Sequence, residues 1–277
     1  MKKGRLSTII LIVFLLVGLS LLLYPTVSNY WNSLHQSRAI AEYVEQVADL
    51  SGESYEKFLN DARVYNQSLL AQENPYVMTA ERQARYDALL NVSGNGILGY
   101  VEVPSIDCAL PIYHGVEDTV LQIAVGHIAG STLPIGGENT HSVLSGHRGL
   151  PSARLFTDLD KVAIGDYFTL RVLDETLTYE VDQILIVEPH ETSALTVEKG
   201  KDYCTLVTCT PYGINTHRLL VRGTRVENRR QSEAARITAD AMQVDARLVA
   251  PVVAMPVLLV LLILLFVKTP RRRKKQC

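Results

Sequence analysis

Residues 205–223 read TLVTCTPYGINTHRLLVRG, and this stretch is the most informative part of the sequence. Apolar and β-branched residues fill Cys204 to Cys209 and Arg218 to Arg225, a composition typical of two strands. A hairpin between them would bring Cys209, at the end of the first strand, and Arg218, at the start of the second, to one end of a sheet. The stretch therefore predicts a β scaffold that presents a thiol and a guanidinium to a cleft.

Short strands are expected throughout residues 96–226, where Gly, Pro and Asp clusters separate runs rich in Val, Ile, Leu, Thr and Tyr. Besides the two strands above, these runs predict strands at Ile97 to Val103, Ala109 to Tyr113, His141 to Ser145, Tyr167 to Leu173 and Leu177 to Val187. Short helices are expected at Val116 to Ala124 and Ala153 to Leu159. Seven or eight strands over about 130 residues indicate a closed barrel or a sandwich.

Residues 25–95 are expected to be a helical region, because apolar residues recur in it at helical spacing. Asp49-Leu50-Ser51-Gly52 interrupts the pattern, and further helices are expected at Tyr55 to Leu70 and at Glu81 to Leu90. Asn74-Pro75-Tyr76 lies between these two helices. Since Asn-Pro favours a turn, a loop is predicted there.

Two apolar runs, Leu6 to Tyr24 and Val249 to Val267, are each about 19 residues long and lack charges. Each is long enough to cross a hydrocarbon core of roughly 30 Å as a helix. Because Lys and Arg flank them in residues 1–5 and 268–277, both termini are expected in the cytoplasm and residues 25–248 outside. The first run is alternatively a signal peptide, although no small-x-small cleavage site follows it.

The part expected outside the membrane is acidic. It holds all 29 Asp and Glu, whereas nine of the 27 Lys and Arg lie in the flanks, so its formal net charge is −11. Nucleic acids and anionic lipids call for the opposite sign, and no nucleic-acid partner is expected. The charge alternatively serves only solubility. Residues 227–248 are expected to form a polar helical stalk that leads to the second apolar run.

The chain has four cysteines, and Cys277 lies in the basic tail. Three remain outside, an odd number, so at least one of them is free or bonded to another molecule. Cys204 and Cys209 differ in parity along one strand, so their side chains face opposite sides and no disulfide between them is expected. A bond between Cys108 and Cys204 is conceivable. A buried, unreactive thiol is the ordinary alternative, and it fits Cys204 better than Cys209.

A histidine near Cys209 would complete a thiol nucleophile, because the thiolate is the form that attacks. His147 is the candidate, in the Gly-flanked turn Leu144-Ser145-Gly146-His147-Arg148-Gly149. His127, in another Gly-rich turn, is the main rival, and a surface or core role is the alternative for either. Arg218 would hold a developing oxyanion or a substrate carbonyl, and its alternative role is a surface ion pair.

Several segments together resemble the sortase family. TLVTCTPYGINTHRLLVRG is similar to the sortase signature TLxTC followed by an arginine, and LSGHRGLPSARLFTDL (residues 144–159) resembles the histidine segment of the class C, pilin-polymerising sortases. The likeness also includes LGYVEVPSIDCALPIYHG and GHIAGSTLPIGG. It covers residues 96–226, about half the chain, and two apolar ends suit the same class.

The resemblance implies an eight-stranded sortase β-barrel, preceded by helices and flanked by two transmembrane helices. Cys209, His147 and Arg218 would be its catalytic triad. Cys209 would attack the Thr carbonyl of an LPxTG-like sorting signal to form a thioester, with His147 as general acid and base and Arg218 at the oxyanion. A lysine amine of a second pilin would resolve the thioester into an isopeptide bond. Thr208 would support the nucleophile, and a strand-core role is equally open.

The family also has a lid, a loop before the barrel with an Asp-Pro-aromatic motif. Its aromatic ring covers the cysteine, and its Asp meets the arginine. Asn74, Pro75 and Tyr76 are the candidates here. Because Asn74 lacks the charge to pair with Arg218, the lid is expected to close more weakly, since a charge-assisted contact is roughly twice as strong as a neutral one. A plain turn between helices is the alternative.

Other functions remain open. Anchoring of surface proteins to the cell wall is the alternative within the family, and a hydrolytic protease would pass through the same acyl-enzyme. Outside the enzymes, the alternative is a membrane-tethered binding module whose Cys209 is structural. No spacing of Cys, His or carboxylates suggests a metal site, and no cofactor is expected.

Overall fold

The computed structural model describes residues 2–228. Ser28–Arg230 forms one compact unit, and Met1–Val27 belongs to a second. The expected stalk from residue 229 on, the second apolar run and the basic tail lie outside the described residues.

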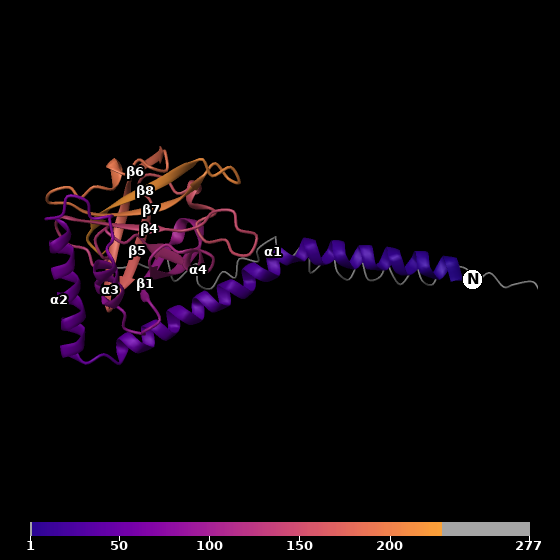
Figure 1. Cartoon of the computed structure of the whole chain (residues 1–277), viewed down its shortest axis with the longest axis horizontal. Helices are drawn as coiled ribbons and strands as arrows, with labels where there is room; N and C mark the ends of the chain where they lie inside the picture. Colours follow the sequence, from indigo (N-terminus) through magenta and orange to yellow (C-terminus); the bar gives the residue numbers. More distant parts are fainter. Residues whose placement is uncertain (1, 229–277) are drawn as a thin grey trace, which may run out of the picture. The chain divides into compact units, whose positions relative to one another are not determined.

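Three helices precede the barrel. Helix α1 (Lys2–Ala48) is continuous through Pro25 and contains a stretch long and apolar enough to cross a membrane. The expected apolar run, Leu6 to Tyr24, and the expected helical residues before Asp49 are therefore parts of one helix (Figure 1). Helices α2 (Gly52–Leu69) and α3 (Ala80–Ala88) begin where Ser51 and Thr79 accept a hydrogen bond from a first-turn N–H.

Eight strands close into a barrel in the order β1-β2-β3-β4-β7-β8-β6-β5, so the structure is not a sandwich. Neighbouring strands run antiparallel, except that β2 pairs with β3 and β4 pairs with β7 in parallel. The strands are β1 (Ile97–Val103), β2 (Cys108–His114), β3 (Val125–His127), β4 (Thr140–Ser145), β5 (Tyr167–Val172), β6 (Glu175–Val187), β7 (Asp202–Thr210) and β8 (His217–Val226).

The seven strands expected from the sequence are present within two residues of their predicted ends, and β3, which is three residues long, was not predicted. Short helices lie between the strands: α4 (Asp118–Leu121), η1 (Pro104–Ile106), η2 (Leu159–Lys161) and η3 (Ser193–Leu195). The prediction of a helix at Ala153 to Leu159 was wrong. Residues 155–158 form turns and Leu159 begins η2, because Leu155 has a φ of +41°, which a right-handed helix does not allow.

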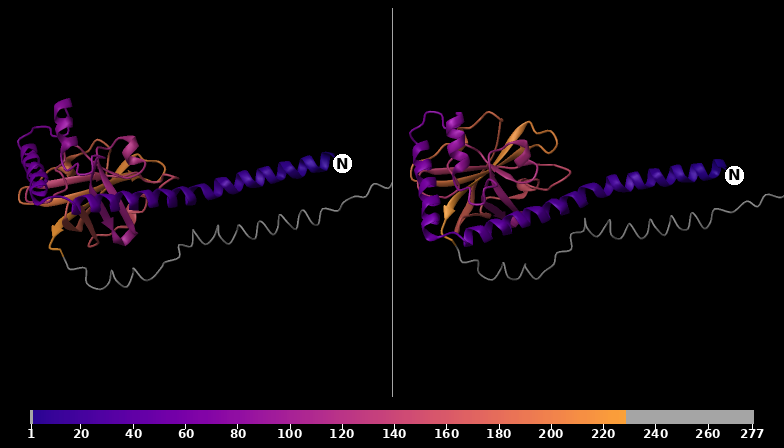
Figure 2. Two further views of the ribbon diagram at one scale, coloured as in Figure 1. Left: turned by 90° about the horizontal axis from the view of Figure 1, so that it is seen from below. Right: turned by 60° about the horizontal axis from the view of Figure 1, so that its bottom comes forward.

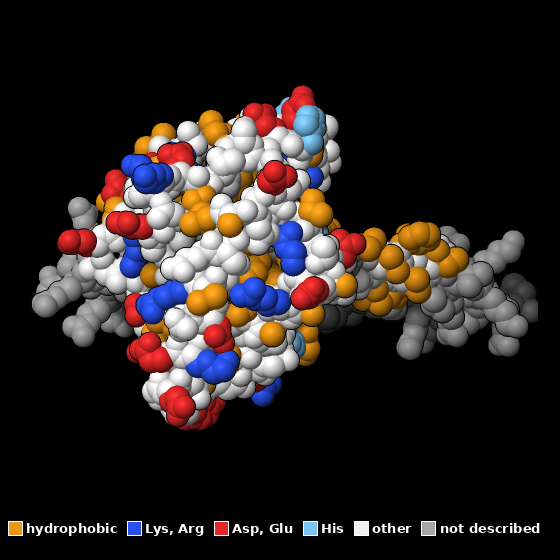
Figure 3. Space-filling model, turned by 60° about the vertical axis from the view of Figure 1, so that its left-hand side comes forward, with side chains coloured by type: hydrophobic (Ala, Val, Ile, Leu, Met, Phe, Trp, Pro, Cys, Tyr) orange, Lys and Arg blue, Asp and Glu red, His pale blue; other side chains and the backbone are white. Residues whose placement is uncertain are grey.

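Alternating side chains fill the barrel. Val101, Leu144, Phe168, Leu206 and Val221 are fully buried members of one interior cluster that unites the strands with α2 and α3. On the face shown in Figure 3, Lys and Arg side chains are interspersed with Asp and Glu, so the acidic residues are not gathered in one patch there.

Helices α2 and α3 lie side by side in both views of Figure 2, and the Tyr65 and Tyr86 rings that join them are 6.2 Å apart. Buried polar contacts attach both helices to the barrel part. Asn66 of α2 exchanges two hydrogen bonds with the backbone of Leu133, at 3.1 and 2.7 Å. Tyr86 of α3 bonds His127 at the end of β3. The loop between the helices is therefore held at both ends.

Candidate active site

The ends of three neighbouring strands bring the predicted site residues together. Cys209 on β7 and Arg218 on β8 are direct cross-strand partners. Strand β4 lies on the other side of β7, and a Gly146 N–H bond of 3.0 Å to the Val207 carbonyl extends their parallel pairing past Ser145. His147 follows Gly146 directly in the chain, so it lies just past this end of β4. The ends of β4, β7 and β8 are thus neighbours, and they carry candidate residues up to 71 positions apart in the chain.

The Cys209 and Arg218 side chains also share a face of the barrel. Because side chains alternate along a strand, Cys209 faces the same side as Val207, and Arg218 the same side as Leu220. Val207 and Leu220 do not belong to the barrel interior. They belong to an outer apolar patch, which consists of Val143, Val187, Leu195, Val207 and Leu220 with Ile128, Leu185 and Ala194 packed against them. Cys209 and Arg218 therefore lie at the end of an apolar surface outside the barrel.

Thr208 connects two parts of this site. Its side chain is 1% exposed, and its Oγ1 donates a 2.7 Å hydrogen bond to the carbonyl of Gly146, which directly precedes His147. The hydroxyl thus joins the backbone before His147 to the backbone before Cys209.

All three cysteines of the barrel are free, so the conceivable bond between Cys108 and Cys204 is not formed. Cys204 belongs to the barrel interior, on the face opposite to Cys209, as the strand parity predicted. Burial raises the pKa of the thiols of both Cys108 and Cys204, which keeps them protonated. Cys209 is half-buried, like Cys108, and lies at a strand end, whereas Cys204 is fully buried.

The two rival histidines differ in their surroundings. His127 is fully buried, and its Nδ1 accepts a 2.8 Å hydrogen bond from the Tyr86 hydroxyl in the tautomer whose Nε2–H donates to the Thr132 carbonyl at 2.9 Å. Burial lowers the pKa of His127 to about 4, so this ring is neutral. Both of its nitrogens already have hydrogen-bond partners. His147 is half-buried beside the end of β7. The surroundings favour His147 as the partner of Cys209.

The Arg218 guanidinium points to the connection between β7 and β8. Its Nη1 donates to the carbonyls of Asn215, at 3.3 Å, and His217, at 3.1 Å. Within residues 2–228, no carboxylate forms an ion pair with Arg218. Its charge therefore remains available to an anion in the site.

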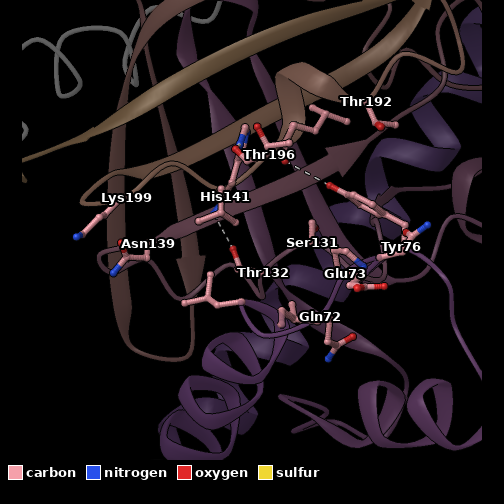
Figure 4. A pocket seen from close by; sticks show the side chains of 17 residues that line it. Gln72, Glu73, Tyr76, Ser131, Thr132, Asn139, His141, Thr192, Thr196 and Lys199 are labelled. Atoms are coloured by element: carbon pink, nitrogen blue, oxygen red, sulfur yellow. Dashed lines mark hydrogen bonds between the residues drawn. The ribbon is translucent and has the colours of Figure 1, made fainter.

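Asn74, Pro75 and Tyr76 line a cavity of about 550 Å³ between the end of α2 and the β6–β7 connection (Figure 4). The Tyr76 hydroxyl donates to the Leu195 carbonyl at 3.3 Å. Gly130 lies against this loop so closely that a Cβ there would be 2.5 Å from the Pro75 carbonyl oxygen. Among the described contacts, none joins residues 74–76 to Cys209 or Arg218. The loop is instead attached to the outer apolar patch, through Leu195.

His141 also lines this cavity, and the sequence pointed only to a strand edge for it. Its Nδ1 lies 2.9 Å from the Thr196 carbonyl and its Nε2 lies 2.7 Å from Thr205 Oγ1, so it fastens the β6–β7 connection to β4 and β7. The outer apolar patch was missed as well. Its signal was the continuous apolar run Leu219-Leu220-Val221, which is typical of a strand covered on both faces.

A closed eight-stranded barrel with a half-buried cysteine between a histidine and an arginine defines a class of cysteine enzymes, and comparison with known proteins names it. Residues 101–226 match the family model described as the sortase domain. Sortase C1 from Streptococcus agalactiae is 50% identical, with a TM-score of 0.68, over 69% of this chain and 100% of that structure.

Two further class C structures are similar. Sortase C from Streptococcus pneumoniae, whose structure bears on pilin substrate specificity, is 43% identical, with a TM-score of 0.60, over 68% of this chain and 96% of that one. Sortase C from Clostridium perfringens, solved with the C-terminal cell wall sorting motif, is 41% identical, with a TM-score of 0.60, over 69% of this chain and 99% of that one. The chain belongs to the sortase family. It is a cysteine transpeptidase.

Proposed function

We propose that this sortase polymerises pilins on the outer face of the membrane, with Cys209, His147 and Arg218 as its catalytic residues. The observation that carries the proposal is the convergence of the ends of β4, β7 and β8 on one face of the barrel. The similarity to class C sortases, including one whose structure bears on pilin specificity, supports the choice of substrate.

In the first half of the reaction, the Cys209 thiolate attacks the Thr carbonyl carbon of an LPxTG-like sorting signal. The carbonyl oxygen takes the negative charge in the tetrahedral intermediate, and the Arg218 guanidinium stabilises it, because no carboxylate among the described residues neutralises that charge. His147 gives a proton to the departing amine as the C–N bond breaks. A thioester on Cys209 remains.

In the second half, the ε-amine of a lysine on another pilin attacks the thioester carbon. His147 removes a proton from this amine, the C–S bond breaks, and the sulfur leaves as the thiolate. The product is an isopeptide bond between two pilins. The enzyme returns to its starting state without any cofactor.

The outer apolar patch is suited to the apolar residues of the sorting signal. Val207 lies two residues before Cys209, and Leu220 lies two residues after Arg218. The patch therefore begins directly beside the proposed nucleophile. Leu195, on the β6–β7 connection, borders it and accepts the bond from Tyr76. We therefore assign Asn74, Pro75 and Tyr76 the role of a lid that controls entry to this surface.

The location of the enzyme follows from its first helix. An apolar stretch of α1 is able to cross a membrane, and the basic residues Lys2, Lys3 and Arg5 before it favour a cytoplasmic N-terminus. The barrel is then outside the cell, where pilins and the cell wall are found. Two spans, with residues 249–267 as the second, remain part of this proposal.

Mass spectrometry of the barrel incubated with an LPxTG-type peptide tests the chemistry. We expect an acyl adduct on Cys209 that is lost on adding a lysine-bearing pilin fragment, with an isopeptide-linked product. An adduct on Cys108 or Cys204, or an unchanged rate in Cys209→Ala, would overturn the assignment.

Cell-wall anchoring is the second candidate, since the same acyl-enzyme serves both reactions. The test is competition between the pilin fragment and a cell-wall peptide amine for the preformed thioester. Faster transfer to the pilin lysine supports polymerisation, and faster transfer to the cell-wall amine supports anchoring.

A further inference from the structure

Arg148 directly follows His147, and its guanidinium is enclosed by the two segments that follow β4 and β7. We propose that Arg148 is a positioning residue that holds His147 level with Cys209. The proposal rests on the proposed roles of His147 and Cys209 and adds a residue that does not touch the substrate.

The contacts of Arg148 reach both sides of the site. Its side chain is 8% exposed. Nη1 donates to the hydroxyl of Thr210, the residue after Cys209, at 3.3 Å, and Nη2 is paired with Asp160 of η2. The guanidinium also lies 5.8 Å from the centre of the Tyr212 ring. One planar group thus connects the turn of His147, the strand end of Cys209 and a helix that neither belongs to.

The backbone around His147 leaves little freedom for other arrangements. A Cβ at Gly149 would be 3.0 Å from the Tyr212 ring, and one at Gly146 would be 2.6 Å from the Phe156 ring. The Phe156 N–H donates to the His147 carbonyl at 3.1 Å. These contacts shape the turn, but only the Arg148 guanidinium, among the contacts described, extends from it to the hydroxyl of Thr210.

The far end of the same segment is held independently. Asn32 of α1 donates to the Ser152 carbonyl at 2.8 Å, and Asn29 accepts from the Arg154 N–H at 2.8 Å. With the distal end fixed in this way, loss of the Arg148 contacts would remove the tie between the His147 turn and Thr210, and the bonds at Gly146 and from Phe156 would remain. The position of the imidazole relative to the thiol would then vary, and both proton transfers depend on that position.

Kinetics of the full chain in detergent test the proposal, with an LPxTG-type peptide as donor. In Arg148→Ala, we expect thioester formation to slow by roughly ten- to a hundredfold, with KM nearly unchanged, because misplacement of a catalytic group affects the chemical step. Arg148→Lys should recover part of the rate, since lysine keeps a positive charge for Asp160 but lacks the planar, forked guanidinium. The melting temperature is measured for each variant.

Arg171→Ala is the matched control. Arg171 on β5 also donates to a Thr hydroxyl, Thr176 at 2.7 Å, and its Nε also faces a carboxylate, Glu102 at 3.7 Å. As in Arg148, the Nε is buried and forms no hydrogen bond among the described residues. It lies on a strand that does not border β4, β7 or β8. We expect a smaller fall in melting temperature, because the Arg171 side chain is 35% exposed, and an unchanged rate. An equal fall of the rate in both variants, or an unchanged rate in Arg148→Ala, overturns the proposal.

A second pair of variants decides the question if Arg148→Ala does not fold. Thr210→Ser keeps the hydroxyl that Arg148 reaches, whereas Thr210→Val removes it at nearly constant volume. The positioning role requires a slower chemical step in the valine variant and a normal one in the serine variant, and equal rates in the two exclude it. Cys209→Ala, measured alongside, separates this result from a failure of the site itself, because transpeptidation that survives in it contradicts the proposed function instead.

Discussion

Replacement of His127 is expected to change the stability of the fold, whereas replacement of His147 is expected to change the rate of the reaction. His127→Gln is the more informative of the two changes. The pKa of His127 is about 4 in the folded barrel and 6.5 in an ordinary setting. Between these two pH values, the unfolded chain binds a proton that the folded chain does not. The contribution of His127 to the free energy of unfolding is therefore fully present above pH 6.5, and it is lost as the pH falls towards 4. At 1.36 kcal/mol per pKa unit, the loss due to His127 is at most about 3 kcal/mol.

The assay is urea unfolding followed by circular dichroism at a series of pH values from 7 to 4.5. The wild type should lose stability over this range, and buried His114 and His141, whose pKa values are also lowered, act in the same direction. In His127→Gln the slope should become shallower, because glutamine can hydrogen-bond Tyr86 without titrating. Activity at pH 7 should be nearly normal.

His147→Ala should instead lower the rate by roughly 10²-fold or more, because the general acid and base is lost. Parallel stability curves for the wild type and His127→Gln would refute the reasoning about the buried ring. A rate that collapses in His127→Gln but not in His147→Ala would show that the wrong histidine was chosen as the base.

Three further predictions concern the site and its surroundings. Cys209→Ala should abolish transpeptidation without lowering the melting temperature, as measured by peptide ligation and calorimetry. Tyr76→Ala should speed the labelling of Cys209 by a bulky thiol reagent, because the loop loses the ring that attaches it at Leu195 beside the outer apolar patch. Equal labelling in the variant and the wild type means that the loop is not a lid. Asn32→Ala should raise hydrogen exchange around Ser152, whose carbonyl loses its 2.8 Å bond, and an unchanged exchange pattern would contradict the contact.

The local elements of the fold were predictable because they depend on neighbours in the chain. Strands such as β1, at Ile97–Val103, have the length and the β-branched composition that their pairing requires, and the predicted bounds were correct. Strand β3 was missed, because three residues, Val125–His127, are too few for a periodic pattern. The helix expected at Ala153 to Leu159 failed for a reason that composition does not reveal, the left-handed backbone at Leu155.

The candidate site divides in the same way. The signature around Cys209 and the hairpin to Arg218 are local, so their cross-strand pairing was predictable. The residues alone left His147 and His127 as rivals, because glycines flank both, and the family resemblance selected His147. The structure adds that His127 ends β3 and that the distant Tyr86 bonds its Nδ1.

The sequence by itself determined the residue types of the site, the alternation that places Cys204 and Cys209 on opposite faces, and the apolar stretch of α1. The tertiary structure alone decided that the strands close into a barrel, that β4 lies parallel to β7, and that the loop of Tyr76 is attached at Leu195. The reason is physical. Strand alternation and helix periodicity act over a few residues, whereas barrel closure and loop docking depend on hydrogen bonds and packing between residues 60 to 120 positions apart, which no local pattern encodes.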